Sequence, residues 1–373
     1  MIVGVLKEPA FESRVSLLAE AVSALVKKKI EVWVEEGAGI SAYCGDDDYR
    51  KAGANIRSRE EVLGAADILL SIHYNDIPGT LEHKVLIGVF FPLYHQAHLP
   101  VWAKQHITSF SLDMLPRTTR AQSMDVLSSQ ANIAGYKAIL LAAGLSPHFF
   151  PMMMTAAGSI APARVLILGA GVAGLQAIAT ARRLGTVVEV FDTRPAVKEE
   201  VMSLGAKFIE VEGAADASKA GGYAVEQSEE FRGRQQQKIA ESIARADIVV
   251  TTAQIPGKRA PLLVTGAMIE GMRKGSVIID LAAATGGNTE VTRNNETVFH
   301  KGVIVVGNSA LPATMPYDAS KLYGKNVSNF LQLITGKEGG LNLNFGDELV
   351  KGCCITHDGA VVHEKLKEIV KSE

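Results

Sequence analysis

Three glycines at a fixed spacing carry the clearest chemical signal in the sequence. Gly169, Gly171 and Gly174, with Val172 and Ala173 between the last two, form a G-x-G-x-x-G pattern directly after an apolar run. In a strand, turn and helix unit, the first glycine permits a tight turn, the second lets a pyrophosphate approach the backbone, and the third lets helix and strand pack. The N-terminus of the following helix favours the negative charge of the phosphates. The pattern therefore predicts a dinucleotide-binding turn.

An acidic residue follows at the distance such a turn requires. Asp192 ends the next predicted strand, 18 residues after Gly174. A carboxylate there accepts hydrogen bonds from the adenosine ribose hydroxyls and repels a 2′-phosphate. Thr193 and Arg194 continue the loop, and Arg194 leaves an alternative open, because an arginine can accommodate that phosphate. Since Asp192 stands at the strand end, we predict NAD(H) rather than NADP(H) as the ligand.

A second group of polar residues precedes the glycines by about 40 positions. Gln122, Asp125 and Ser129 are spaced by three and four residues, so they share one face of a predicted helix, with Ser128 beside them and Arg117 upstream. Such a face directs polar groups into a cleft or into solvent. Spacing alone favours a solvated face with an Arg-Asp pair.

Three loops are further candidates for the site. The polar segment 212–237 is long for a loop in a compact domain, so it is either a functional lid, with Tyr223 after Gly222 at its tip, or an inert insertion. Segments 251–258, which contains Gln254, and 280–288 each follow a predicted strand. Carboxyl ends of parallel strands are where open α/β sheets bind ligands, so both are candidate walls of the nicotinamide end.

The elements that position these residues alternate between short apolar runs and helical patterns, which is typical of parallel sheets covered by helices. We predict an α/β protein of two Rossmann-like, doubly wound parallel-sheet domains with an intervening cleft. The first domain comprises 1–127 and 311–373, because the chain returns to it, and the NAD(H)-binding domain comprises 128–310. The predicted strands are 2–5, 30–34, 68–72, 85–89, 107–111, 165–168, 187–191, 207–210, 248–252, 277–280 and 303–306. The predicted helices include 15–27, 120–143 and 316–335, and the segment 348–363 is predicted to form a hairpin that turns at 357–359.

Composition narrows the classes of partner. The 373 residues carry a formal net charge of −2, so no basic excess is available to neutralise nucleic acid. Three cysteines show neither disulfide-framework nor metal-ligand spacing, which predicts no metal and a reducing, cytosolic compartment. The uncharged stretch 165–181 resembles a marginal membrane span, but its glycines favour a strand, turn and helix. We therefore expect no membrane span and no secretory signal.

Four segments together resemble the NAD(H)-binding domain I of proton-translocating NAD(P) transhydrogenase, alpha subunit. They are RAQSMD at 120–125, GAGVAGLQ at 169–176, AGGYA at 220–224 and GGN at 286–288. The resemblance implies direct hydride transfer from NADH on this chain to NADP⁺ on a separate domain III, coupled to proton movement through a membrane domain. Without a membrane segment, the chain resembles the split form, with domain III and the membrane domain on other chains. A homodimer on the cytoplasmic face of the inner membrane is also implied.

The resemblance also assigns roles to individual residues. Arg117, Gln122, Asp125 and Ser128 would surround the nicotinamide, with Tyr136 nearby. Tyr223 would lie on a loop that closes over NAD(H), followed by Gln235. NADP(H) would be bound by the partner domain and not by this chain.

The related alanine dehydrogenases are the main alternative. Arg14 and His95 resemble substrate-site residues of that enzyme. Where its strand ends in a Lys-Val-Lys-Glu-like run, however, this chain reads Ser71-Ile-His73, and Ala284 replaces an aspartate. Oxidative deamination needs a proton acceptor and a group that activates water, so these differences disfavour it. A non-enzymatic NAD-sensing module is a third hypothesis, which does not account for the polar cluster 117–128.

Overall fold

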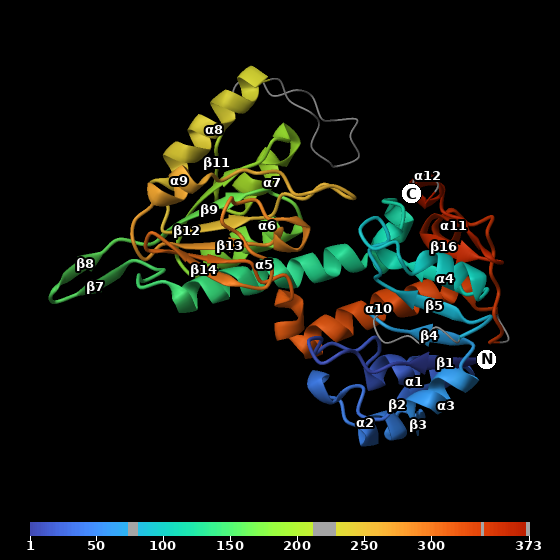
Figure 1. Cartoon of the computed structure of the whole chain (residues 1–373). Helices are drawn as coiled ribbons and strands as arrows, with labels where there is room; N and C mark the ends of the chain where they lie inside the picture. The colour runs from blue at the N-terminus through green and yellow to red at the C-terminus, as the bar shows by residue number, and fades with distance from the viewer. Residues whose placement is uncertain (74–80, 212–228, 337–338, 371–373) are drawn as a thin grey trace. The chain divides into compact units, whose positions relative to one another are not determined.

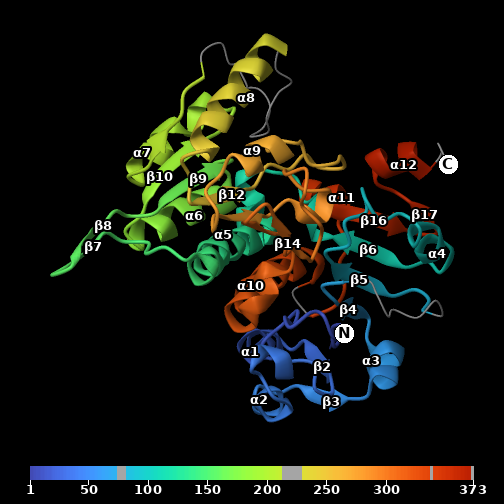
Figure 2. The same ribbon diagram turned by 60° about the vertical axis from the view of Figure 1, so that its left-hand side comes forward.

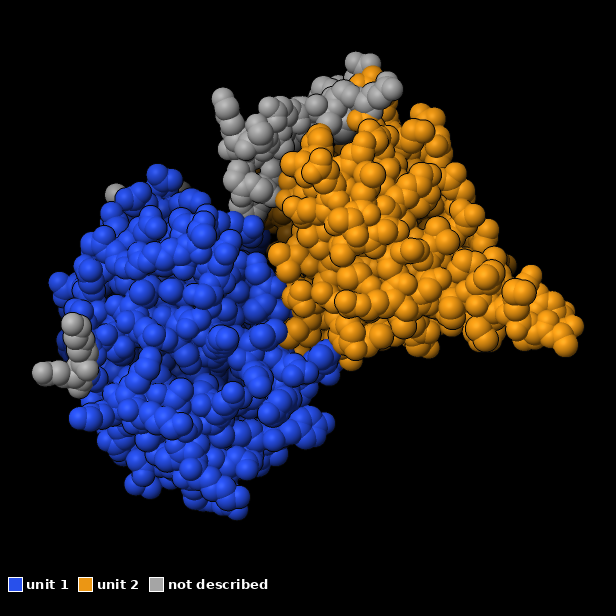
Figure 3. Space-filling model, turned by 180° about the vertical axis from the view of Figure 1, so that it is seen from behind, with its two compact units in different colours: residues 1–130, 313–373 blue, residues 131–312 orange. Residues whose placement is uncertain are grey.

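The computed structural model describes residues 1–73, 81–211, 229–336 and 339–370, and the chain divides into two compact units. Unit 1 consists of residues 1–130 and 313–373, and unit 2 of residues 131–312 (Figure 3). Each unit has a mainly parallel sheet with helices on both faces (Figure 1). The predicted α/β class with two Rossmann-like, doubly wound sheets is therefore confirmed.

The sheet of unit 1 has the strand order β17-β16-β6-β5-β4-β1-β2-β3. Its parallel strands are β1 (Ile2–Val5), β2 (Glu31–Glu35), β3 (Asn55–Arg57), β4 (Ile68–Leu70), β5 (Val85–Gly88) and β6 (Thr108–Ser111). β16 (Cys354–His357) and β17 (Ala360–Val361), from the end of the chain, form an antiparallel edge beside β6. The helices are α1 (Ala19–Lys27), α2 (Asp46–Lys51), α3 (Arg59–Ala65), α4 (Leu99–Lys104), α10 (Pro316–Ile334), α11 (Glu348–Cys353) and α12 (Glu364–Val370).

Alternation along the central strands of unit 1 creates two cores, one on each face of the sheet. Ile68 and Leu70 of β4 belong to one core, and Leu69 between them belongs to the other. α1 and α10 contribute to the first core, and α3 and α4 to the second. Because consecutive strand residues point to opposite faces, the near-continuous apolar runs seen in the sequence are those of strands buried on both sides.

Unit 2 has the strand order β11-β10-β9-β12-β13-β15-β14 (Figure 2). The parallel strands are β9 (Arg164–Leu168), β10 (Val187–Phe191), β11 (Lys207–Phe208), β12 (Ile248–Thr251), β13 (Val277–Asp280) and β15 (Val303–Val306), and β14 (Thr297–His300) is antiparallel to β15. The helices are α6 (Val172–Arg183), α7 (Lys198–Ser203), α8 (Glu229–Ile243) and α9 (Gly266–Glu270). A separate hairpin of β7 (Met153–Thr155) and β8 (Gly158–Ile160) projects from this unit (Figure 1).

The helix predicted over 120–143 is wrong at its start. Thr119–Met124 forms a 3₁₀ helix, and the α-helix, α5, spans Val126–Leu145. Asp125 separates the two because its backbone is extended, with φ −73° and ψ 90°. Its side chain accepts a hydrogen bond from Ser128 N at 2.9 Å, which is a helix N-cap. α5 runs from the last residues of the first segment of unit 1 into unit 2.

Other differences have local causes. The helix predicted over 15–27 begins only at Ala19, because Leu18 is extended. The start of the predicted tail hairpin is helical instead, since Asp347 caps α11 through Leu349 N. The rest of that hairpin forms, and its turn residues Asp358 and Gly359 both have positive φ, as a tight hairpin turn requires. Short strands β3, β7, β8 and β14 carry too little apolar pattern to be predicted. Across the described ranges, no helix is long and apolar enough to cross a membrane.

Candidate functional site

The glycine turn between β9 and α6 combines two positions closed by packing with one that is open. Gly169 has φ +110°, and a Cβ there would lie 2.3 Å from Thr252 Oγ1. A Cβ on Gly174 would lie 1.9 Å from the carbonyl oxygen of Gly169. At Gly171 nothing lies within 4 Å. The chain's own packing therefore explains the first and third glycines, while the second leaves space for a ligand.

The open position stands at the start of α6. Gly171 is the residue before the helix and supplies no side-chain cap, and Val172, the first helical residue, is partly exposed. The first N–H groups of a helix have no intrahelical partner, so this end offers donors and a positive dipole to a pyrophosphate. Ala173, in the same turn, has its carbonyl against Gly135 of α5, where a Cβ would lie at 2.1 Å. The residues present thus fit the phosphates of a dinucleotide.

Asp192 at the end of β10 is already engaged by the chain. Its Oδ2 accepts a hydrogen bond from Ala170 N at 2.7 Å, which connects it to the glycine turn. Arg194 donates to it from Nε at 2.9 Å and Nη2 at 2.8 Å, and the side chains of Asp192 and Arg194 are 6% and 21% exposed. This hydrogen bond raises the pKa of Arg194. Sequence reasoning treated Asp192 and Arg194 as alternatives, with Thr193 half-buried between them, but the structure pairs them.

The ends of β12 and β13 form one connected wall. Buried Asp280 accepts hydrogen bonds from Ala282 N at 2.9 Å, Asn288 N at 2.7 Å and Thr292 Oγ1 at 2.6 Å. Asn288 accepts from the backbone N of Ala253 at 3.0 Å and donates to its carbonyl at 2.9 Å. The two loops after the strands are therefore held together by neutral amides and one buried carboxylate.

The wall reaches the predicted residue Gln254, whose Nε2 donates to the carbonyl of Leu281 at 3.0 Å. Thr252 Oγ1 donates to the carbonyl of Gly169 at 3.2 Å, which connects the wall to the glycine turn. Sequence reasoning missed the roles of Asp280, Asn288 and Thr252. An aspartate at a strand end and an asparagine after Gly286-Gly287 were the available signals.

The polar cluster before α5 is arranged differently from the prediction. Asp125 receives Ser128 N and Ser128 Oγ, the latter at 2.6 Å, so these two side chains are together. Gln122 is exposed in the 3₁₀ helix and Arg117 is exposed in the loop before it. Gln122 and Asp125 are therefore not on one face of α5, because the 3₁₀ segment and the cap at Asp125 interrupt the helical spacing.

The other predicted residues lie on separate elements. Tyr136 is on α5 in unit 2 and is 36% exposed. Gln235 is half-buried on α8, which starts within the segment predicted to be a loop. Gly222 and Tyr223 lie outside the described residues.

Unit 1 contains a buried charged cluster that sequence reasoning did not predict. The Glu12 carboxylate accepts hydrogen bonds from Arg14 Nε at 2.8 Å and Nη2 at 2.6 Å, and lies 2.8 Å from His73 Nε2. Burial raises the pKa of Glu12, but the hydrogen bonds from Arg14 and His73 outweigh it and hold that pKa well below its usual range. Glu8 accepts from Ile72 N at 2.6 Å, and burial raises its pKa to about 7.

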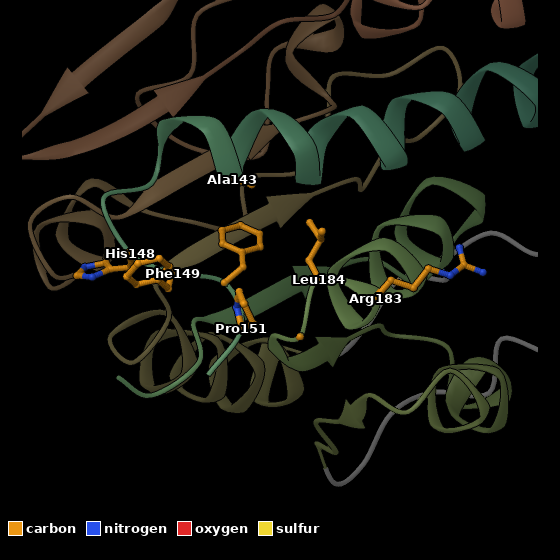
Figure 4. A pocket seen from close by; sticks show the side chains of 8 residues that line it. Ala143, His148, Phe149, Pro151, Arg183 and Leu184 are labelled. Carbon is orange, nitrogen blue, oxygen red and sulfur yellow. The ribbon is translucent and has the colours of Figure 1, made fainter. Parts of the chain in front are cut away.

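The largest hollow in the described structure lies elsewhere in unit 2. It has a volume of about 520 Å³ and lies between the end of α5, the segment before the β7–β8 hairpin and the end of α6 (Figure 4). Its lining is Ala143, His148, Phe149, Phe150, Pro151, Arg183, Leu184 and Gly185. Because these residues are remote from the strand ends, this hollow is not the nucleotide site.

The fold and the glycine turn define a class, the two-unit proteins with a Rossmann-type dinucleotide site. Two family models match, "Alanine dehydrogenase/PNT, N-terminal domain" at residues 4–134 and "Alanine dehydrogenase/PNT, C-terminal domain" at residues 138–364. The first of the separate parts of the NAD(P) transhydrogenase alpha subunit of Rhodospirillum rubrum is 44% identical over 367 residues, covering 95% of this chain and 96% of that protein. The chain therefore belongs to the alanine dehydrogenase/PNT family, and within it to the NAD(P) transhydrogenase alpha subunits.

Solved structures agree with this assignment. The transhydrogenase from Sinorhizobium meliloti matches with a TM-score of 0.88 and 43% identity, covering 97% of this chain and 100% of that one. An L-alanine dehydrogenase matches with a TM-score of 0.82 and 23% identity, covering 100% and 99%. The second match shows a shared fold, whereas the first extends to the sequence. The predicted resemblance to transhydrogenase is confirmed.

Proposed function

We propose that this chain is the NAD(H)-binding component of a proton-translocating transhydrogenase and passes hydride directly between NADH and NADP⁺ bound on a partner domain III. The observation that carries the proposal is the construction of the site in unit 2. The position of Gly171 is open, and the adjoining wall consists of backbone and neutral groups whose one carboxylate, Asp280, is fully engaged. Hydride transfer between two nicotinamides exchanges no proton at the reacting carbons, so such a wall suffices.

Each part of the site then has a physical task. The glycine turn holds the pyrophosphate, and Asp192 with Arg194 faces the adenosine ribose. Gln122, Asp125, Ser128 and Arg117 orient the nicotinamide, with Tyr136, Gln254 and Gln235 completing the cofactor contacts. NADH supplies the hydride, and the residues of the chain bind it, orient its ring and exclude water. Asp125 and Ser128 are already hydrogen-bonded to each other, which pre-organises one side of the nicotinamide subsite.

The partners follow from the same assignment. The Rhodospirillum relative is named as one part of an alpha subunit, which supports domain III and the membrane domain being on separate chains. The chain would attach through them to the cytoplasmic face of the inner membrane. A homodimer is supported by the β7–β8 hairpin, on which Met152 is 61%, Met154 75% and Ile160 48% exposed. Apolar side chains on a projecting arm are suited to burial against a second copy.

A stopped-flow assay with a domain III protein tests the proposal. NADH should bind to the chain in calorimetry, and its hydride should reach an NADP⁺ analogue only when domain III is added. L-alanine with NAD⁺ should give no turnover, because in unit 1 the Nε, Nη1 and Nη2 atoms of Arg14 already donate to Glu12 and Gln130. Turnover of alanine at ordinary dehydrogenase rates, on the order of 1 to 10³ per second, would favour the alternative enzyme.

A further inference from the structure

A continuous series of hydrogen bonds in unit 1 connects the loop after β4 to α5. His73 Nε2 and Glu12 Oε2 lie 2.8 Å apart, and Glu12 accepts from the backbone N, Nε and Nη2 of Arg14 at 2.6 to 2.9 Å. Arg14 Nη1 donates to Gln130 Oε1 at 2.8 Å. Gln130 Nε2 then donates to the carbonyl of Ala319 in α10 at 3.1 Å. α5 is thereby joined to two other segments of unit 1 through one side chain.

Stability alone is a weak explanation for this series. The side chains of Arg14 and Glu12 are 12% and 3% exposed, so both charges have lost most of their water. Desolvation costs several kcal/mol per ion, and an apolar pair of similar volume avoids it. What a guanidinium supplies beyond an apolar side chain is direction, because its planar fork fixes the angle between Glu12 and Gln130.

Gln130 lies within one turn of the groups that we assign to the nicotinamide. Ser128 is two residues before it, and Asp125 caps the same turn. Residues two apart on a helix point in different directions, so Gln130 is held in unit 1 without covering Ser128. Val126 buries its side chain in the core of unit 1, but an apolar contact tolerates rotation of the helix. The directional bonds of Gln130 restrict that rotation.

The continuation of α5 is fixed by different contacts. In unit 2, Asn132 Nδ2 donates to Gln176 Oε1 at 3.2 Å, and Gly135 touches the carbonyl of Ala173. These contacts locate the helix against the glycine turn of α6. Gln130 is therefore the point at which unit 1 sets the orientation of the same helix.

We propose that Gln130 and Arg14, oriented by Glu12, are positioning residues that set the rotation of the first turn of α5 and so direct Asp125 and Ser128 toward the nicotinamide. This inference rests on the proposed function. It gives Arg14 the task of holding a helix rather than of binding a substrate carboxylate.

Two variants of Gln130 test this assignment in the full-length chain. Gln130→Leu removes both hydrogen bonds, and Gln130→Glu keeps an acceptor for Arg14 while losing the donor to Ala319. The control is Gln332→Leu on α10, an exposed glutamine that donates only within its own helix among its described contacts. Three quantities are measured for each protein: NADH affinity, hydride transfer to an NADP⁺ analogue on domain III, and amide hydrogen exchange of residues 127–130.

The expected results separate positioning from a general loss of fold. Gln130→Leu should slow transfer by about 10- to 100-fold, since a 1 Å misplacement costs about 10²-fold, and should leave NADH affinity within about twofold. Exchange at 127–130 should become about 10-fold faster. Gln130→Glu should recover most of the rate, and Gln332→Leu should match the parent chain.

Contrary results are equally clear. Transfer by Gln130→Leu at the parent rate overturns the proposal, and so does an equal loss of rate and NADH affinity in both Gln130 variants. If the parent chain transfers no hydride to domain III, the proposed function fails, and the exchange measurement then judges the anchoring alone. Unchanged exchange in Gln130→Leu would refute it.

Discussion

The carboxyl ends of the two sheets are used in opposite ways. In unit 1, the loops after β1 and β4 bring together Glu8, Glu12, Arg14 and His73, and these charged side chains satisfy one another. In unit 2, the loop after β9 is made of glycine and alanine and leaves helix N–H groups without a side-chain cap. Topology offers the same edge in both units. Whether that edge can receive a ligand depends on whether the chain's own charges already occupy it.

The largest expected effect comes from breaking the closed edge of unit 1. Glu12→Ala leaves the buried guanidinium of Arg14 without its carboxylate, which should destabilise unit 1 by about 3 to 5 kcal/mol. Denaturant unfolding followed by tryptophan fluorescence measures this loss, because both tryptophans, Trp33 and Trp102, are in unit 1. The exposed pair Arg50 and Asp47 provides the control, and Asp47→Ala should cost less than about 1 kcal/mol. Equal effects in the two variants would contradict the buried network.

The second prediction tests the open edge of unit 2. Gly171→Ala adds a Cβ where nothing lies within 4 Å, so the unfolding temperature should stay near that of the parent chain. NADH affinity should fall about 100-fold, because the new methyl group occupies the approach of the pyrophosphate. Gly144→Ala on α5 also enters open space and should change neither quantity appreciably. Tight NADH binding by Gly171→Ala would remove this turn from the site.

A smaller effect is expected at the pair that faces the adenosine ribose. Arg194→Ala removes the charge that offsets Asp192, so the 2′-phosphate of NADPH should be repelled more strongly. The ratio of NADPH to NADH dissociation constants should rise about 10-fold in calorimetry at moderate salt. Lys198→Ala removes a nearby exposed cation that pairs with Glu210 and should leave the ratio unchanged. A ratio that falls in Arg194→Ala would instead assign Arg194 to the phosphate.

The smallest effect concerns proton uptake at the closed edge. Burial raises the pKa of Glu8 to about 7, from about 4.5 in the unfolded chain. The folded state therefore holds a proton between these values, and the contribution of Glu8 to stability is full below pH 4.5 and lost as the pH rises through about 7. The melting temperature of Glu8→Gln relative to the parent should rise by a few degrees from about pH 5 to about pH 8. Glu60→Gln, on the exposed surface of α3, should show no such trend.

The predictability of the fold follows from where its information lies. Buried strands such as Val187–Phe191 and Val277–Asp280 have the predicted bounds, because an apolar run and its flanking turn residues are local signals. The glycine turn is equally local. The start of α5 was wrong because the cap made by Asp125 competes with the helical periodicity that continues through Thr119–Met124.

The charged cluster of unit 1 could not be predicted, because its members are far apart in the sequence. Glu12 and His73 are separated by 61 positions, and Arg14 and Gln130 by 116. Only the sheet topology brings them together. The pairing of Asp192 with Arg194 was within reach of the sequence, since the two are neighbours, but nothing in composition indicates that both would turn toward each other rather than toward a ligand.

The insertion of unit 2 into unit 1 also sets an order for folding during synthesis. Phe330 of α10 contacts Phe110 with ring centroids 5.3 Å apart, so the core of unit 1 needs a helix that is translated after the whole of residues 131–312. At about 5 to 20 residues per second, the ribosome takes roughly 10 to 40 s to make that segment. Unit 2 is continuous and completes its sheet in this interval, while the apolar faces of β1 and β4 wait uncovered. The segment of the chain that emerges first is thus finished last, and it is where a nascent chain of this protein needs a chaperone.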